Sequence, residues 1–146
     1  MSIKQINVLF KGLIFILGIS GIGLLLIIAP EIASNIVLIL FWLTAIPVFL
    51  ILANLWKISS HLLKETLFSE KNSLRLNRIA YFSLVESTIY ALAIMLGFIL
   101  FKENYPYFFI CLFFFFLGIT LAVIAALLSY IFKLANQLKK ENDLTI

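Results

Sequence analysis

The residue best suited to carry chemistry is Glu86, the one acidic residue within the four long apolar stretches of the chain. An ionised carboxylate near the middle of a bilayer costs roughly 2.5–3.5 kcal/mol on insertion scales, so such residues usually face the interior of a helix bundle. Ser83 and Tyr90 lie three residues before it and four residues after it. On a helix these side chains share its face and can form hydrogen bonds with it. Lys11, at the start of the first apolar stretch, is the candidate ion-pair partner.

Two interpretations of Glu86 remain open. The carboxyl could be a proton or cation site, or it could be a hydrogen-bonded or ion-paired contact between helices. We favour the packing contact, because no second acidic residue in the apolar stretches continues a pathway across the membrane.

Other groups that carry catalytic or metal-binding chemistry are scarce. His61 is the only histidine and lies on a charged segment, while Cys111 is the only cysteine and lies inside an apolar stretch. The chain therefore has few residues from which a Ser–His dyad or a histidine metal site could be built. The chain also has no glycine-rich phosphate loop. We expect no enzyme, and no catalytic, cofactor or metal site.

The composition indicates an integral membrane protein with a single domain. The chain is 64% hydrophobic and only 12% charged, against roughly 45–50% and 25% for soluble domains. Its mean hydropathy is +1.16. So few polar side chains cannot cover a water-soluble globule of 146 residues.

The apolar stretches predict an all-α membrane protein with four transmembrane helices. A spanning helix needs about 20 apolar residues, and we expect spans over about 8–29, 33–56, 79–101 and 107–132. Short connectors should join these spans into antiparallel hairpins. Pro30 should end the first helix, and Ser69 is a good N-cap for a helix that starts at Glu70 and continues into the third span.

The fourth span carries a pattern of small residues. Gly118, Ala122 and Ala126 recur every fourth residue. Small side chains let helix backbones approach closely in lipid. We expect this ridge to face a neighbouring helix.

The basic residues predict the orientation. Ten of the eleven Lys and Arg lie in the N-terminus, in the central segment 57–78 or in the tail 133–146, and Lys102 alone lies on the opposite side. Basic residues of short loops stay in the cytoplasm. Both termini and the central segment are therefore expected to be cytoplasmic, with anionic lipid headgroups attracted to that face.

Three motifs together resemble a known family. APEIA after the first span, FSEKNSLRLNRIAY entering the third and the closing ENDLTI are similar in order and spacing to the bacterial domain-of-unknown-function family 2975. The similarity runs from about Ala29 to Ile146. It implies a small four-helix protein of the bacterial cell membrane, and members of that family are often encoded beside a small helix-turn-helix regulator. It implies no established activity and no catalytic residue.

The central segment and the tail are predicted to form one cytoplasmic platform for a partner. The segment is basic and the tail ends in acidic residues, so the two attract, and Leu144 and Ile146 could dock against leucines of the segment. The alternative is a frayed tail that only adds solubility. The candidate platform residues are Lys64, Lys71, Arg75, Arg78, Glu141, Asn142, Asp143, Leu144 and Ile146.

The function that these features favour is a non-enzymatic regulatory or scaffold protein that holds a cytoplasmic partner, such as a helix-turn-helix regulator, at the membrane. The alternative is a small oligomeric transporter or channel that uses Glu86. Direct nucleic-acid binding is a poor fit, because no aromatic residues interleave the charges of the central segment. The sequence leaves open whether the chain forms a homo-oligomer.

Overall fold

The computed structural model describes residues 2–32, 35–61, 67–100 and 105–144, and nearly all of them are helical. The elements are α1 (Ile3–Gly23), the π-helical turn η1 (Leu24–Ile28), the short α2 (Ala29–Ile32), α3 (Asn35–Ser59), α4 (Glu70–Leu100) and α5 (Tyr105–Leu144). Four helices are long and apolar enough to cross a membrane, over Ile3–Ile27, Ile36–Ser59, Glu70–Leu100 and Tyr105–Asp143. The predicted all-α class with four membrane-length helices is confirmed.

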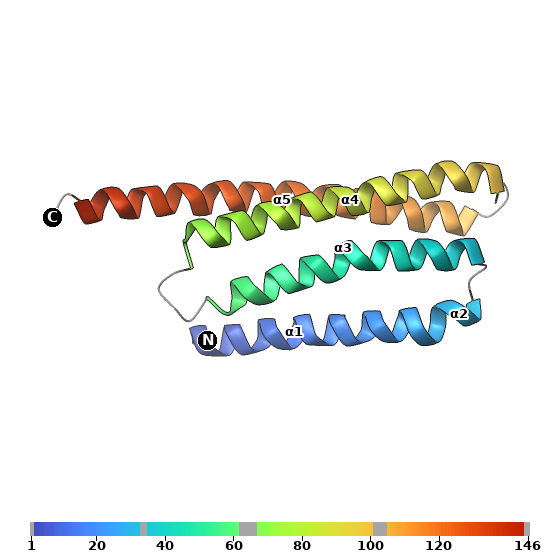
Figure 1. Cartoon of the computed structure of the whole chain (residues 1–146), viewed down its shortest axis with the longest axis horizontal. Helices are drawn as coiled ribbons and strands as arrows, with labels where there is room; N and C mark the ends of the chain where they lie inside the picture. The colour runs from blue at the N-terminus through green and yellow to red at the C-terminus, as the bar shows by residue number, and fades with distance from the viewer. Residues whose placement is uncertain (1, 33–34, 62–66, 101–104, 145–146) are drawn as a thin grey trace.

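The long helices lie next to one another in chain order (Figure 1). α4 packs against α5 over most of its length, α3 packs against α4, and α1 packs against α3. α3 therefore separates α1 from α4. α5 is the longest helix, with 40 residues, and its C-terminal part extends beyond the other helices (Figure 1).

The distribution of side chains is the reverse of that in a water-soluble bundle. Large apolar side chains such as Phe109 and Ile99 are about 70% exposed, whereas Asn72, Ser59 and Ser83 are the largest side chains with almost no exposure. Lipid solvates apolar side chains but offers no hydrogen bonds, so polar groups are retained between helices. This distribution is that of a helical membrane protein.

The predicted start of the third long helix is confirmed. α4 begins at Glu70, and the backbone N–H of Asn72 lies 3.4 Å from the Ser69 hydroxyl oxygen. The backbone N–H of Ser73 donates to the Ser69 carbonyl at 3.0 Å. Ser69 thus partners N–H groups that a helix start leaves without intrahelical acceptors.

The prediction that Pro30 ends the first helix is wrong. The helical path continues through η1 into α2, and Pro30 is the second residue of α2. Proline has no N–H to donate to the preceding turn, and its ring crowds that turn, so a proline inside a continuous helical path distorts it locally. The π-helical turn before it changes the hydrogen-bond register, and the chain bends there without a break in helical structure.

The ridge of small residues on α5 is present, but one of its members differs from the prediction. Ala122 and Ala125 are buried, whereas Ala126 is exposed. A period of 3.6 residues alternates steps of four and three, so the buried row is Gly118, Ala122, Ala125 and Ser129. This row faces α4, where Ser73 and Ser129 exchange hydrogen bonds from each hydroxyl to the other residue's backbone oxygen, both at 2.8 Å.

Gly118→Ala is expected to loosen the contact between α4 and α5. A β-carbon at this position would collide with the Ser87 hydroxyl and would lie 3.0 Å from the Ser83 backbone oxygen, which cannot rotate away. Overpacking of this kind costs roughly 1–3 kcal/mol, so the variant should unfold at a lower temperature in detergent. Gly18→Ala is the matched control, because nothing lies within 4 Å of a β-carbon there. Equal melting temperatures for Gly118→Ala and the native chain would contradict the close approach.

Candidate functional site

Glu86 lies within the membrane-length part of α4 and is buried, with 8% of its surface exposed. It is seven residues beyond Ile79, where the apolar stretch of α4 begins, which places it roughly 10 Å into the span at 1.5 Å per residue. Ser83, one turn earlier on the same face, is 1% exposed. The helix periodicity therefore turns both polar side chains away from lipid.

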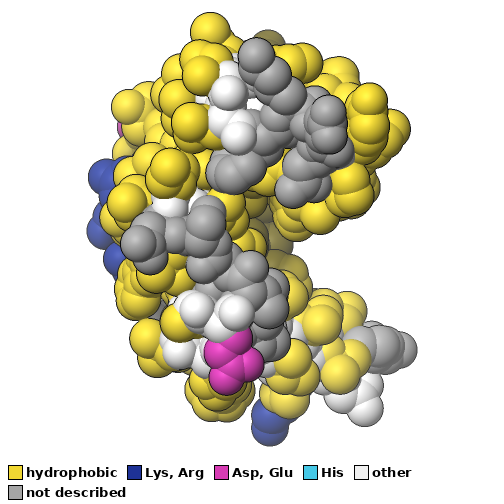
Figure 2. Space-filling model, turned by 90° about the vertical axis from the view of Figure 1, so that its right-hand side faces the viewer, with side chains coloured by type: hydrophobic (Ala, Val, Ile, Leu, Met, Phe, Trp, Pro, Cys, Tyr) yellow, Lys and Arg dark blue, Asp and Glu magenta, His cyan; other side chains and the backbone are white. Residues whose placement is uncertain are grey.

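These residues line a cleft to which all four long helices contribute. The cleft has a volume of about 310 Å³. Figure 2, in which the right-hand end of Figure 1 faces the viewer, shows the molecule hollowed along one side, with visible walls that are mostly hydrophobic. The polar lining residues are Thr44, Ser83, Glu86 and Tyr90.

Two polar atoms of the residues that line the cleft lack partners. Ser83 Oγ and Glu86 Oε2 are the buried side-chain oxygens among the described residues that form no hydrogen bond. The hydrogen-bonded packing contact that the sequence favoured for Glu86 is therefore not made by Oε2. Buried polar atoms without partners are rare in proteins and call for an explanation.

Tyr90 lies in the same cleft, as its spacing from Glu86 predicts. Its ring stacks on Phe114 of α5, with centroids 5.2 Å apart and planes 16° from parallel. The structure thus brings together three of the four predicted intramembrane residues: Ser83, Glu86 and Tyr90.

Lys11 does not join them, and its predicted pairing with Glu86 is wrong. Its ammonium group lies 5.3 Å from the centroid of the Trp56 ring on α3. Asn7, one turn earlier on α1, accepts a hydrogen bond from the Ser59 hydroxyl at 2.5 Å. These contacts hold the start of α1 against the end of α3, and α3 lies between Lys11 and the helix that carries Glu86.

Arg75, which is among the predicted platform residues, connects α4 to the end of α3 and to the residues that follow it. Its guanidinium donates to Asn72 Oδ1 at 2.8 Å and lies 3.1 Å from His61 Nδ1. Asn72 is fully buried, and its amide donates to the Leu67 carbonyl at 2.9 Å. Sequence analysis did not identify this cluster; its signal was a histidine, an asparagine and an arginine near the two ends of one connector.

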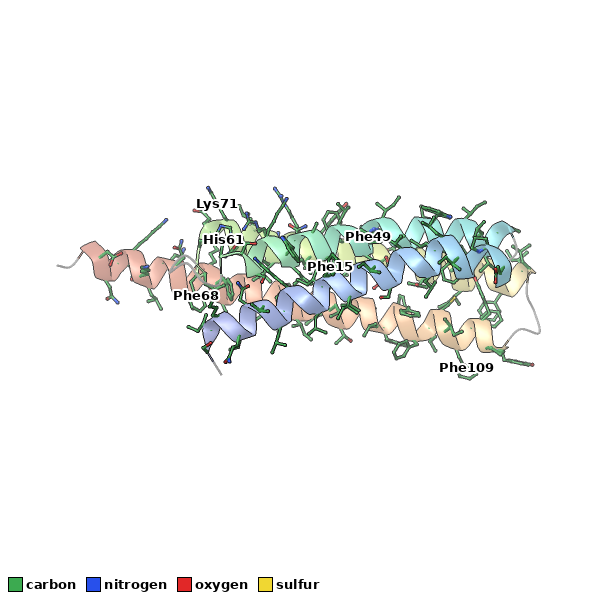
Figure 3. All side chains as sticks on the ribbon, turned by 90° about the horizontal axis from the view of Figure 1, so that it is seen from below. Phe15, Phe49, His61, Phe68, Lys71 and Phe109 are labelled. Atoms are coloured by element: carbon green, nitrogen blue, oxygen red, sulfur yellow. The ribbon has the colours of Figure 1, made fainter. Side chains whose placement is uncertain are left out.

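The structure describes some of the other predicted platform residues. Lys71, Arg78, Glu141, Asn142 and Asp143 are exposed. Figure 3 shows Lys71 and His61 near the part of the molecule from which α5 extends, with Phe109 toward the opposite end. Lys64 and Ile146 lie outside the described residues, as does the side chain of Leu144. The predicted docking of Leu144 and Ile146 therefore stays a prediction.

The fold and its exposed apolar surface define a multi-pass helical membrane protein. The family model described as protein of unknown function (DUF2975) matches residues 28–146. The chain belongs to this family, as its three motifs predicted. No curated protein and no solved structure matches the chain.

Glu86→Leu is expected to keep or raise the melting temperature in detergent. Oε2 has no hydrogen bond to lose, and removing a buried polar atom without a partner recovers roughly 1–3 kcal/mol. Ser129→Ala should instead lower the melting temperature, because its hydroxyl donates to the Ser73 backbone oxygen. Loss of this hydrogen bond should reduce the free energy of unfolding by about 1 kcal/mol. Thermal unfolding of both variants in one detergent makes the comparison. A loss of stability in Glu86→Leu equal to that in Ser129→Ala would mean that Glu86 stabilises the bundle.

Proposed function

We propose that the protein is a non-enzymatic regulatory or scaffold protein that holds a cytoplasmic partner at the membrane of a bacterial cell. The observation that carries this proposal is the continuation of α5 beyond the bundle. We call residues 133–144 the α5 extension. Leu134 and Leu138 on this extension are 45% and 55% exposed.

The length of the α5 extension makes it accessible to a partner. Phe132 packs edge-on against Phe68, just before α4 begins, with ring centroids 4.9 Å apart. Twelve further residues to Leu144 give about 18 Å of helix at 1.5 Å per residue. Leu134 and Leu138 are four residues apart and share one face. An exposed apolar stripe of this kind suits a groove on another protein.

The orientation that we propose is with both termini in the cytoplasm and the spans joined as antiparallel hairpins. Contacts between Asn7 and Ser59, and between Phe68 and Phe132, support it because they gather distant parts of the chain at one end. Most of the basic residues lie in these parts, and such residues are retained in the cytoplasm. The exposed Lys71 and Arg78 then face anionic lipid headgroups.

The partner that we propose is a soluble regulator, such as a small helix-turn-helix protein. The membrane protein would recruit it through the α5 extension and would not itself contact nucleic acid. The extension carries two exposed leucines together with three lysines and two acidic residues, Glu141 and Asp143. The partner surface should therefore combine an apolar groove with charged edges of complementary sign.

A second candidate function is an oligomeric transporter or channel that uses Glu86. The observation in its favour is the unpartnered carboxyl oxygen within the cleft. A pathway for ions needs several polar groups across the membrane, and only four polar residues line this cleft. We therefore place the scaffold first.

The orientation predicts which positions react with an impermeant thiol reagent. On a Cys111→Ser background, Lys102→Cys should be labelled on intact cells, and Lys71→Cys only after the cells are opened. Cys111 is the only cysteine of the chain, so its replacement leaves the introduced cysteine as the one thiol that can react. Labelling of position 71 on intact cells would reverse the orientation and remove the cytoplasmic surface that the proposal requires.

The α5 extension should cross-link to a soluble protein. A photoreactive amino acid at Gln137, which is exposed, should give one specific adduct in cells, identified by mass spectrometry. Leu134→Ser with Leu138→Ser should abolish the adduct while the chain remains in the membrane, and deletion of residues 141–146 should weaken it. Lys133→Ser with Lys139→Ser is the control that keeps the leucines. An adduct that survives the loss of both leucines would show that they are not the docking surface.

A further inference from the structure

The cleft around Glu86 has a chemistry that the docking role of the α5 extension does not use. We infer that it binds a lipophilic ammonium ion, that is, a membrane-dissolved molecule with an apolar body and a protonated amine. The amine would lie between Glu86 Oε2 and Ser83 Oγ, and the apolar body would occupy the cleft. This inference is independent of the cytoplasmic surface.

The carboxyl group supplies the charge that such a ligand needs. A buried carboxylate calls for a positive partner, because its solvation is lost inside the protein. Residues 12–56, 79–101 and 103–132 contain no lysine, arginine or histidine. Lys11 lies over Trp56. A cation that pairs with Glu86 must therefore come from outside the described chain.

Ser83 adds selectivity for an amine that carries N–H groups. Its hydroxyl oxygen has no hydrogen-bond partner and lies one helical turn from Glu86, on the same face of α4. Both residues line the cleft. A protonated primary amine has three N–H donors and can reach both oxygens, whereas a quaternary ammonium has none.

The remaining walls of the cleft suit an organic cation. Aromatic rings attract cations to their faces, and this attraction is stronger when water is excluded. Four aromatic residues line the cleft, namely Phe41, Phe49, Tyr90 and Phe114. The volume of 310 Å³ equals about ten water-sized volumes at roughly 30 Å³ each. A short alkyl or aryl body fits this space, and a longer one can continue through the open side into lipid.

Other ligand classes fit less well. Glu86 is the single carboxylate among the lining residues, whereas calcium takes six to eight oxygen ligands. An acyl chain of a lipid would contact the apolar walls of the cleft but would give neither Glu86 Oε2 nor Ser83 Oγ a hydrogen-bond partner. A helix from a second copy of the chain could cover the cleft, and the experiment below separates this case.

The test measures binding of radiolabelled decylamine to the whole protein in nanodiscs of neutral phosphatidylcholine. We expect saturable binding of one decylamine per chain, above the partition into empty nanodiscs. Decanol, which has the same chain without the charge, should not compete. Absence of saturable binding would overturn the inference, because the cleft would then hold no amine. Equal competition by decanol would also overturn it, because the cleft would then bind the alkyl chain without regard to charge.

Four variants connect the binding to the named residues. Glu86→Gln keeps the shape but removes the charge and should weaken binding at least ~10-fold. Ser83→Ala should weaken decylamine binding and leave decyltrimethylammonium binding unchanged. Ala45→Phe, which adds a ring within the cleft, should block both ligands. Glu70→Gln is the matched control on the same helix and should bind decylamine as the native chain does, because Glu70 is exposed at the start of α4.

Two outcomes with these variants would overturn the inference. The first is native affinity for decylamine in Glu86→Gln that keeps the native melting temperature. The second concerns Leu24→Cys on the Cys111→Ser background, which places a thiol on the cleft wall. A disulfide between the Leu24→Cys positions of two chains would show a dimer across the cleft. The cleft would then be occupied by a second copy of the chain.

Discussion

The close packing of α4 against α5 supports the rest of the molecule. Lipid provides no hydrophobic drive for helices to associate, so backbones must approach closely and polar groups must find partners between them. Gly118 permits the approach, and Ser73 and Ser129 exchange hydrogen bonds across it. Near the other end of the pair, the Tyr107 hydroxyl donates to the Ala93 backbone oxygen at 2.9 Å. α3 then packs against α4. Among the long helices, α3 is the one with which α1 makes substantial contact.

This order of helices produces the cleft. α1 contacts α3 and α5 contacts α4, and all four long helices contribute residues to the lining of the cleft. The serines between α4 and α5 are hydrogen-bonded, as Ser87 is to the backbone oxygens of Ser83 and Phe115 at 3.0 and 3.2 Å. Glu86 Oε2 and the Ser83 hydroxyl are not. α4 therefore carries two kinds of polar group. Those with hydrogen-bond partners hold α4 against α5, and those without partners line the surface that is available to a ligand.

The two proposed binding sites lie at different places along the molecule and depend on different interactions. In the membrane cleft a single charge in an apolar surrounding would select a cation, because a buried carboxylate without a partner is costly. On the α5 extension, leucines exposed beyond the bundle would select a protein groove, because apolar surface in water favours burial. α5 connects the two, since Phe114 lines the cleft and Leu134 lies twenty residues later on the same helix.

The sequence by itself determined the medium, the number of membrane-length helices, the start of α4 at Ser69 and the family, because these depend on composition, apolar length, local capping and linear motifs. It also placed Ser83, Glu86 and Tyr90 on one face, since helix periodicity alone decides that. Only the tertiary structure decided which residues meet. α3 lies between α1 and α4, so Lys11 contacts Trp56 and not Glu86. Likewise, Arg75 turns toward His61 and Asn72, and Ala125 is buried instead of Ala126. Such partners depend on the order and rotation of the helices, which a uniformly apolar sequence leaves unspecified because every face of each span is compatible with lipid.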